Sequence, residues 1–204
     1  MRSILDFFGK TMSEEEILLS AGGFYNSEGY YGMLSIRAAV ILHKMGFETH
    51  IRTYNTEILK PEWSTIGNIA LIKRLEALNK KLVKEKRKAN VTVVDSMLYL
   101  LKNGQDLKIK FPETKDIIQF LERKIPVLIS VWAKTIYGNS DTLATGGHYL
   151  VVIGYDGKNF IVLDPYNGKE RKIDESLLLL AWCNNALNST DFLLAIKPKK
   201  RARR

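Results

Sequence analysis

The sequence predicts an α+β protein in which helices pack on an antiparallel sheet. Helical periodicity dominates the chain before Pro126, and strand patterns dominate after it. The 204 residues contain no internal repeat and no linker-like stretch, and this length is typical of one domain. We therefore expect a single domain over residues 1–196, followed by a short basic tail over residues 197–204.

Six helices are expected before Pro126. Ser13 and Glu16 form a capping box at the start of the second helix, and Gly22-Gly23 ends it. The third helix is apolar on all sides, which is typical of a helix buried between layers. The longest carries leucines on one stripe and lysines at its far end, which we expect to be solvated. The predicted helices span residues 4–8, 13–21, 33–44, 64–88, 94–102 and 114–123.

Strands are expected at alternating or continuously apolar segments. Asp156-Gly157 lies between two such segments and is the strongest hairpin signal in the chain. One more helix, over residues 173–182, precedes the last strand. The predicted strands span residues 47–54, 127–132, 149–155, 160–163 and 192–196.

Composition excludes several classes of protein. Hydrophobic residues make up 46% of the chain and charged residues 26%, so it is not a disordered chain. No apolar run approaches the roughly 18 residues of a membrane span. The net charge is +9, but six positive charges lie in the tail Lys197–Arg204. A nucleic acid could therefore bind only through this tail, and a disordered solubilising tail is the alternative.

Cysteine and histidine usage restricts the chemistry. Cys183 is the one cysteine, which excludes an internal disulfide and a cysteine-based zinc site. The histidines at 43, 50 and 148 have no metal-ligand spacing, so we expect no metal. Asp6 interrupts what would be the apolar stretch of a secretory signal, and we expect a cytoplasmic protein.

The hairpin places a histidine near a carboxylate. If Tyr155-Asp156-Gly157 forms a three-residue loop, the register pairs His148 with Asp164 on one face, with Cβ atoms about 5 Å apart. A loop of even length would put the two side chains on opposite faces. Gly146 and Gly147 leave the rim before His148 without side chains, so we expect them to contact a substrate backbone.

Such a pair provides two members of a nucleophile–histidine–carboxylate array. The carboxylate orients the imidazole and stabilises its cation, and the histidine acts as base and then as acid. Alternatively, His148 only ends a strand and Asp164-Pro165 only forms a turn. The third member is missing, because Cys183 follows a run of leucines and is typical of an inert core cysteine.

Several blocks of sequence resemble, in order, the papain-like cysteine peptidases that process double-glycine leaders of bacteriocins. His148–Asp156, Ile161–Pro165 and Gly168 are similar to the histidine and aspartate blocks of that family. Lys124–Val131 resembles the strand that precedes the histidine block. The N-terminal segments Met1–Lys10, Ser13–Glu16, Ala21-Gly22 and Gly46–Glu48 resemble the first helix of the family and the segments after it.

The resemblance implies a papain-like fold that hydrolyses peptide or amide bonds through a thiol, with a peptide or protein substrate and no cofactor. His148 would be the general base and Asp164 its orienting partner. In the family the first helix starts with a Cys-Gly-Pro pattern, and a glutamine shortly before it supplies the oxyanion hole. Because Met1 falls inside that helix, we expect the cysteine and glutamine to lie upstream of Met1 or to be lost.

Without a nucleophile, the chain as written is expected to be inactive. The alternative is a non-catalytic, papain-like peptide-binding module in which His148 and Asp164 are vestigial. A weaker alternative is a nucleic-acid-associated protein that binds through its basic tail.

Overall fold

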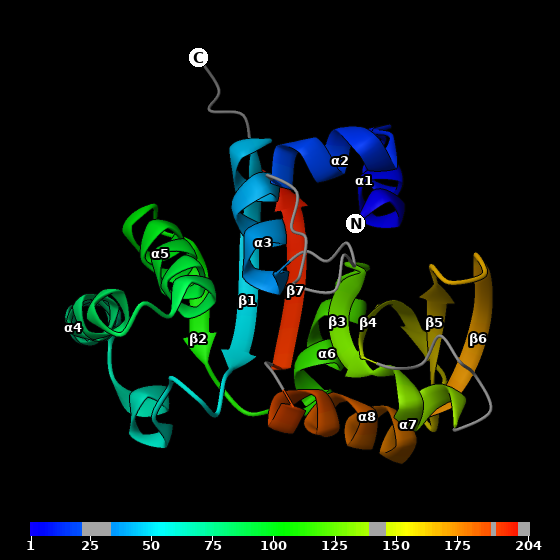
Figure 1. Cartoon of the computed structure of the whole chain (residues 1–204). Coiled ribbons are helices and arrows are strands. Elements are labelled where there is room, and N and C mark those ends of the chain that lie inside the picture. Colours follow the sequence, from blue (N-terminus) through cyan, green and yellow to red (C-terminus); the bar gives the residue numbers. More distant parts are fainter. Residues whose placement is uncertain (22–33, 139–145, 189–190, 200–204) are drawn as a thin grey trace. The chain divides into compact units, whose positions relative to one another are not determined.

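The computed structural model of the chain describes residues 1–21, 34–138, 146–188 and 191–199. Its secondary structure is α+β, which confirms the predicted class (Figure 1). The chain divides into two compact units. The first consists of Met1–Thr49, Pro61–Leu107 and Lys197–Arg204, and the second of His50–Lys60 and Lys108–Ile196. The extent of a peptidase-type domain over residues 1–196 stays a prediction.

The first unit is mainly helical. The predicted capping box is present, because the Glu16 N–H donates to Ser13 Oγ and the Ser13 N–H donates to Glu16 Oε2. The apolar third helix is buried on most of its surface, as predicted. The helices are α1 (Arg2–Phe7), α2 (Glu14–Ala21), α3 (Ser35–Lys44), the 3-10 helix η1 (Pro61–Thr65), α4 (Asn68–Lys84) and α5 (Lys88–Lys102).

The long helix predicted over residues 64–88 is shorter in the structure. It starts at Asn68, after η1, and ends at Lys84, and α5 begins only four residues later. Lys86 breaks the helix because its φ of 57° lies in the left-handed region. The two helices lie against each other, and Leu71, Leu75 and Leu82 of α4 and an apolar face of α5 are buried.

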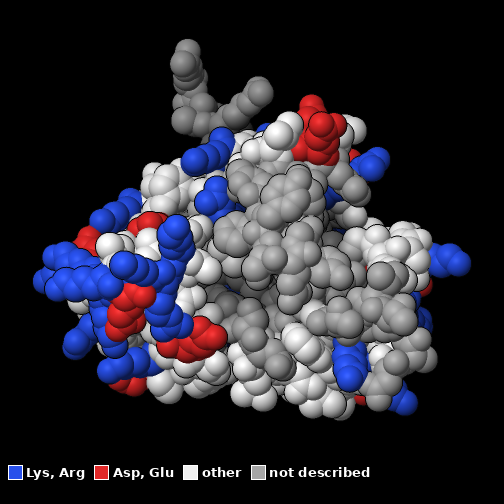
Figure 2. All heavy atoms as spheres, in the orientation of Figure 1, with Lys and Arg blue, Asp and Glu red and all other residues white. Residues whose placement is uncertain are grey.

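Lysine and arginine side chains gather on α4 and at the start of α5. Figure 2 shows this basic surface at the left of the view, over the two helices of Figure 1. The solvation predicted for the lysine-rich end is confirmed. The exposed basic residues of this segment are Lys73, Arg74, Lys80, Lys81, Lys84, Lys86 and Lys88.

Within the described residues, seven strands are hydrogen-bonded in the order β2-β1-β7-β3-β4-β5-β6. The predicted bounds of β1 and β3 match the structure. The strands are β1 (Phe47–Tyr54), β2 (Asp106–Ile109), β3 (Val127–Trp132), β4 (Gly147–Tyr155), β5 (Asn159–Asp164), β6 (Lys169–Asp174) and β7 (Asp191–Pro198).

The pairs β3–β4, β3–β7, β4–β5 and β5–β6 are antiparallel, as predicted. The prediction of an entirely antiparallel sheet is wrong at β2. The side chain of Gln105 accepts from the N–H of Thr49, and the N–H of Lys110 donates to the carbonyl of Thr53. Both segments therefore advance in the same direction, and the sheet is mixed.

The described part of the second unit contains most of the sheet and the helices α6 (Thr114–Leu121), α7 (Ala133–Tyr137) and α8 (Glu175–Asn188). Its core is one cluster of buried side chains from the central strands, α6 and α8. Its buried aromatic side chains are Phe120, Phe160 and Trp182. This core fixes the strands that carry His148 and Asp164.

β7 extends two residues beyond the predicted strand, into the segment expected to be a tail. Lys197 forms a 2.7 Å ion pair with Glu48, and the N–H of Lys199 donates to the carbonyl of Gly46. Residues 200–204 lie outside the described residues, so a disordered tail and its binding of nucleic acid stay predictions. In the described part of the chain, no helix combines the length and the apolar character of a membrane span.

Candidate functional site

His148 and Asp164 come together in the second unit. His148 is the second residue of β4, and Asp164 is the last residue of β5. The imidazole Nε2 lies 3.0 Å from Asp164 Oδ1. The Asp164 side chain is fully buried, whereas 20% of the His148 side chain is exposed. The predicted proximity is therefore confirmed, and the catalytic role of the pair stays a prediction.

The route by which the hairpin brings the two side chains together differs from the predicted one. Tyr155 pairs with Phe160, so the loop has four residues, Asp156–Asn159. Such a loop alone would place His148 and Asp164 on opposite faces. Ile153, however, is an extra residue between Val152 and Gly154, and this β-bulge shifts the register by one. The bulge returns the two side chains to the same face.

Asp164 accepts hydrogen bonds at both carboxylate oxygens. Oδ1 accepts from His148 and, at 3.0 Å, from the N–H of Tyr166. Oδ2 accepts from the hydroxyl of Tyr137 at 2.5 Å and lies 3.5 Å from Nη1 of Arg171. A buried carboxylate needs such partners to remain ionised.

These contacts determine how the carboxyl titrates. Burial would raise the pKa of Asp164, but the hydrogen bonds from Tyr137, His148 and the Tyr166 N–H outweigh it and hold the pKa below its ordinary value. Burial and the adjacent carboxylate raise the pKa of Tyr137 far above that of a free phenol. The structure therefore favours an ionised Asp164 and a neutral Tyr137.

Sequence reasoning did not identify Tyr137 or Arg171. Tyr137 ends α7, a five-residue helix directly after β3, and Arg171 lies on β6. Neither element was predicted. β6 has the sequence Lys-Glu-Arg-Lys-Ile-Asp, whose single apolar residue gives no strand signal. The β5–β6 register of the structure places Arg171 and Asp164 on one face, and the sequence alone carried no signal for this pairing.

The two glycines before His148 have different surroundings. A Cβ on Gly147 would lie 3.0 Å from Oδ1 of Asn185 in α8, whereas a Cβ on Gly146 would meet no atom within 4 Å. A side chain at position 147 would therefore lie in close contact with α8, and Asn185 would have to shift to accommodate it. Substrate contact at Gly146 and Gly147 stays a prediction.

Cys183 has an environment that suppresses thiolate formation. It lies in α8, and burial together with the charge of Asp191 raises the pKa of its thiol. An activated cysteine has the opposite property, a lowered pKa beside a positive charge. The interpretation of Cys183 as an unreactive thiol agrees with these surroundings.

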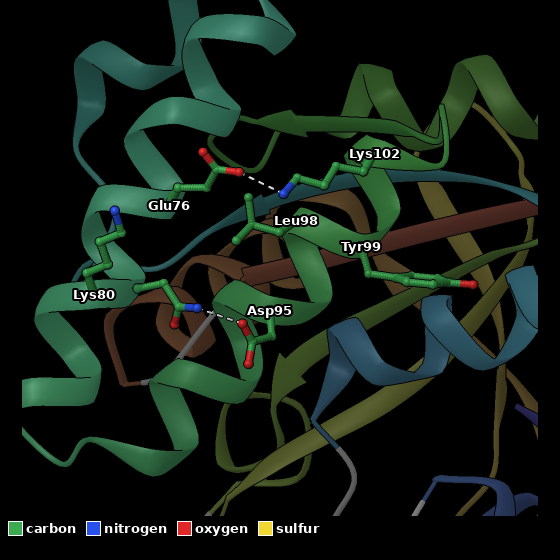
Figure 3. Close-up of a pocket in the computed structure, with 7 residues that line it drawn as sticks. Glu76, Lys80, Asp95, Leu98, Tyr99 and Lys102 are labelled. Carbon is green, nitrogen blue, oxygen red and sulfur yellow. Dashed lines mark hydrogen bonds and ion pairs between the residues drawn. The ribbon is translucent and has the colours of Figure 1, made fainter.

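The first unit has an open hollow of about 570 Å³ between α4 and α5 (Figure 3). Both of its carboxylates have partners. Lys102 Nζ lies 2.7 Å from Glu76 Oε1, and the Asn79 amide donates to Asp95 Oδ1 at 2.7 Å. Lys80 is the remaining charged residue of the lining, and it is exposed. The hollow therefore has no concentration of charge of one sign that would favour an ion.

Within residues 1–21, 34–138, 146–188 and 191–199, no three His, Cys, Asp or Glu side chains come together as metal ligands.

The comparison with protein families identifies the relationship. The model described as the Peptidase_C39 like family matches residues 38–186, a segment that contains both His148 and Asp164. The chain belongs to this family. The predicted relationship to the papain-like cysteine peptidases is therefore confirmed. The matched segment begins within α3. It does not include Met1–Lys10, the segment that resembles the first helix of the family.

The comparisons with solved structures and with curated proteins give weaker relationships or none. A crystal structure of a protein from Bacillus anthracis, described as a C39-like peptidase, aligns with 17% sequence identity and a TM-score of 0.33. The alignment covers 43% of this chain and 49% of that chain. No curated protein matches the sequence.

Proposed function

We propose that this chain is a cysteine-peptidase-type domain acting on peptide or amide bonds, with His148 as general base and Asp164 as its orienting partner. The observation that carries the proposal is the 3.0 Å contact between His148 Nε2 and a fully buried carboxylate, within a chain of the Peptidase_C39 like family. Asp164 is acceptor-only when ionised, so Nε2 carries the proton and donates it.

This tautomer leaves Nδ1 of His148 with its lone pair. Nδ1 is then the nitrogen that can take the proton of a thiol and later return it to the leaving amine. Asp164 stabilises the imidazolium that forms between these two steps. Because the side chain of His148 is partly exposed, a substrate can reach it from solvent.

Two possibilities remain for the nucleophilic thiol of the proposed peptidase. Cys183 is the one cysteine of the sequence, and its raised pKa makes it a poor nucleophile. The cysteine and the oxyanion glutamine of the family therefore either precede Met1 in the native protein or are lost.

The intact mass of the native protein from its own cells tests whether a cysteine precedes Met1. A species heavier than 23.3 kDa, with a cysteine shortly before Met1, would support hydrolysis. That longer form should cleave peptides, and the H148A variant of it should not. A native mass of 23.3 kDa, with no thiol-dependent cleavage, would overturn hydrolysis.

A second candidate function is peptide binding without hydrolysis. The family match begins within α3, whose start at Ser35 follows Tyr31-Gly32-Met33. These three residues lie outside the described residues. If α3 corresponds to the first helix of the family, Tyr31 takes the sequence position of the cysteine in Cys-Gly-Pro, and no thiol is available.

A cysteine introduced at this position distinguishes the two candidates. In a C183S background, the Y31C variant should react with a thiol-directed probe at pH 6 if the position is that of the nucleophile. The reaction should then be lost in the Y31C/H148A variant. If labelling is slow at pH 6 and does not depend on His148, position 31 is not that of the nucleophile. The argument for the binding module, which rests on Tyr31 at that position, then fails.

A further inference from the structure

Asp164 divides its two oxygens between two sets of partners. Oδ1 accepts from His148 and from the backbone N–H of Tyr166, whereas Oδ2 accepts from Tyr137 and lies beside Arg171. The oxygen that orients the imidazole is therefore distinct from the oxygen held by Tyr137 and Arg171. The carboxylate cannot rotate away from His148 without breaking the contacts at Oδ2.

Tyr137 also contacts the other members of this group. Its ring packs edge-on against the His148 imidazole, with centroids 5.6 Å apart. The guanidinium carbon of Arg171 lies 5.1 Å above the centroid of the same ring. Tyr137 thus lies against the histidine, hydrogen-bonds the carboxylate and carries the arginine on its face.

Among the described residues, few charged groups lie near His148. Asp164 on β5 and Arg171 on β6 are the ion-paired groups nearest to it, and Tyr137 of α7 is the adjacent phenol. On β3 the register partner of His148 is the uncharged Val131. Lys169 is opposite Asp164 in the β5–β6 register, with an exposed side chain.

A carboxylate whose charge is shared in this way stabilises an imidazolium less than a free one does. The hydrogen bond from Tyr137 withdraws charge from Asp164, and Arg171 opposes a second positive charge nearby.

We propose that Tyr137 and Arg171 are positioning residues, which hold Asp164 by its second oxygen and offset its charge, so that Asp164 keeps the imidazole of His148 oriented. This inference deepens the proposed function and rests on it for the role of His148. The arrangement of the four side chains does not require that the chain hydrolyse anything.

An NMR titration of His148 in the full chain tests the proposal. The Y137F variant keeps the ring and removes the donor, and the R171M variant removes the charge. We expect each to raise the midpoint of the His148 titration by about 0.5 to 1 unit. Matched controls are Y166F, which keeps the ring packed on Tyr137, and K172M, whose lysine instead pairs with Asp156 at 2.9 Å. Both controls should leave the midpoint unchanged.

The D164N variant separates this proposal from the proposed function. It removes the negative charge and should lower the midpoint of His148. If D164N lowers the midpoint while folded Y137F and R171M leave it unchanged, the positioning role of Tyr137 and Arg171 is overturned. The interaction between His148 and Asp164 is then retained. If D164N also has no effect, the His148–Asp164 pair itself is absent, and the proposed function fails with it. Should Y137F not fold, R171M alone decides the first point.

Discussion

His148 and Asp164 are joined by a hydrogen bond although they are not opposite each other in the β4–β5 ladder. The register pairs Val151 with Leu163, so one further step places Leu150 opposite Asp164. His148 is two residues beyond Leu150 on the same face. The two side chains therefore meet on a diagonal, a spacing that an aromatic side chain can bridge. A long side chain at position 148 is thus a geometric requirement of the pair.

The two glycines at the start of β4 should respond differently to alanine. The G147A variant would place its Cβ 3.0 Å from Asn185 Oδ1, and Asn185 cannot move freely because its amide donates to Ser130 Oγ. We expect G147A to lower the free energy of unfolding by about 1–3 kcal/mol, and G146A to leave it unchanged. Urea unfolding of both variants checks this, and equal stabilities would contradict the packing role of Gly147.

Acidification should remove a stabilising contribution of Asp164. Its folded-state pKa lies below the unfolded value of 3.8, so the contribution is complete above that value and is lost as the pH falls through the folded pKa. Between pH 5 and pH 3 the wild type should therefore lose more free energy of unfolding than D164N does. Parallel losses in the two proteins would show that the carboxylate is not stabilised in the fold.

Asp191 should have the opposite pH dependence. Its carboxyl is buried, and burial raises its pKa to about 8 despite a hydrogen bond from the Tyr54 N–H. The folded state keeps this proton while the unfolded state releases it above about pH 4, so the wild type loses stability as the pH rises from 4 to 8. The D191N variant should lack this loss and melt at a higher temperature than wild type at pH 8. A melting-temperature difference that does not change with pH would contradict the assignment.

Cys183 should be a slow thiol. Because burial and Asp191 raise its pKa, we expect alkylation by iodoacetamide at pH 7.5 to be at least about tenfold slower in the folded chain than in urea. Mass spectrometry of the alkylated protein gives both rates. Fast labelling of the folded chain would make Cys183 a candidate nucleophile again.

Strong local signals predicted much of the fold. β1 and β3 have their predicted bounds because alternating or continuously apolar runs end at clear boundaries, such as Pro126 before β3. The break between α4 and α5 was missed because it occurs at Lys86, a residue type that does not usually mark a helix end. Residues other than glycine seldom adopt a left-handed backbone, so the local sequence carries no signal for the break at this position.

The candidate site was predicted in part. His148 and Asp164 were identified from a hairpin signal, but the predicted three-residue loop is wrong and the bulge at Ile153 compensates for it. Tyr137 and Arg171 were missed because α7 is very short and β6 is polar. Side chains on such elements acquire their role only when the sheet brings them to Asp164.

The bulge at Ile153 separates the tip of the hairpin from the histidine–aspartate pair. Residues inserted into or deleted from Asp156–Asn159 leave the facing of His148 and Asp164 unchanged as long as Val151 still pairs with Leu163. Deleting Ile153 removes the unpaired residue and keeps the pairs on either side of it, so His148 still faces Asp164. If Ile153 instead entered the ladder as a paired residue, the part of β4 before it would shift by one position and His148 would turn away from Asp164.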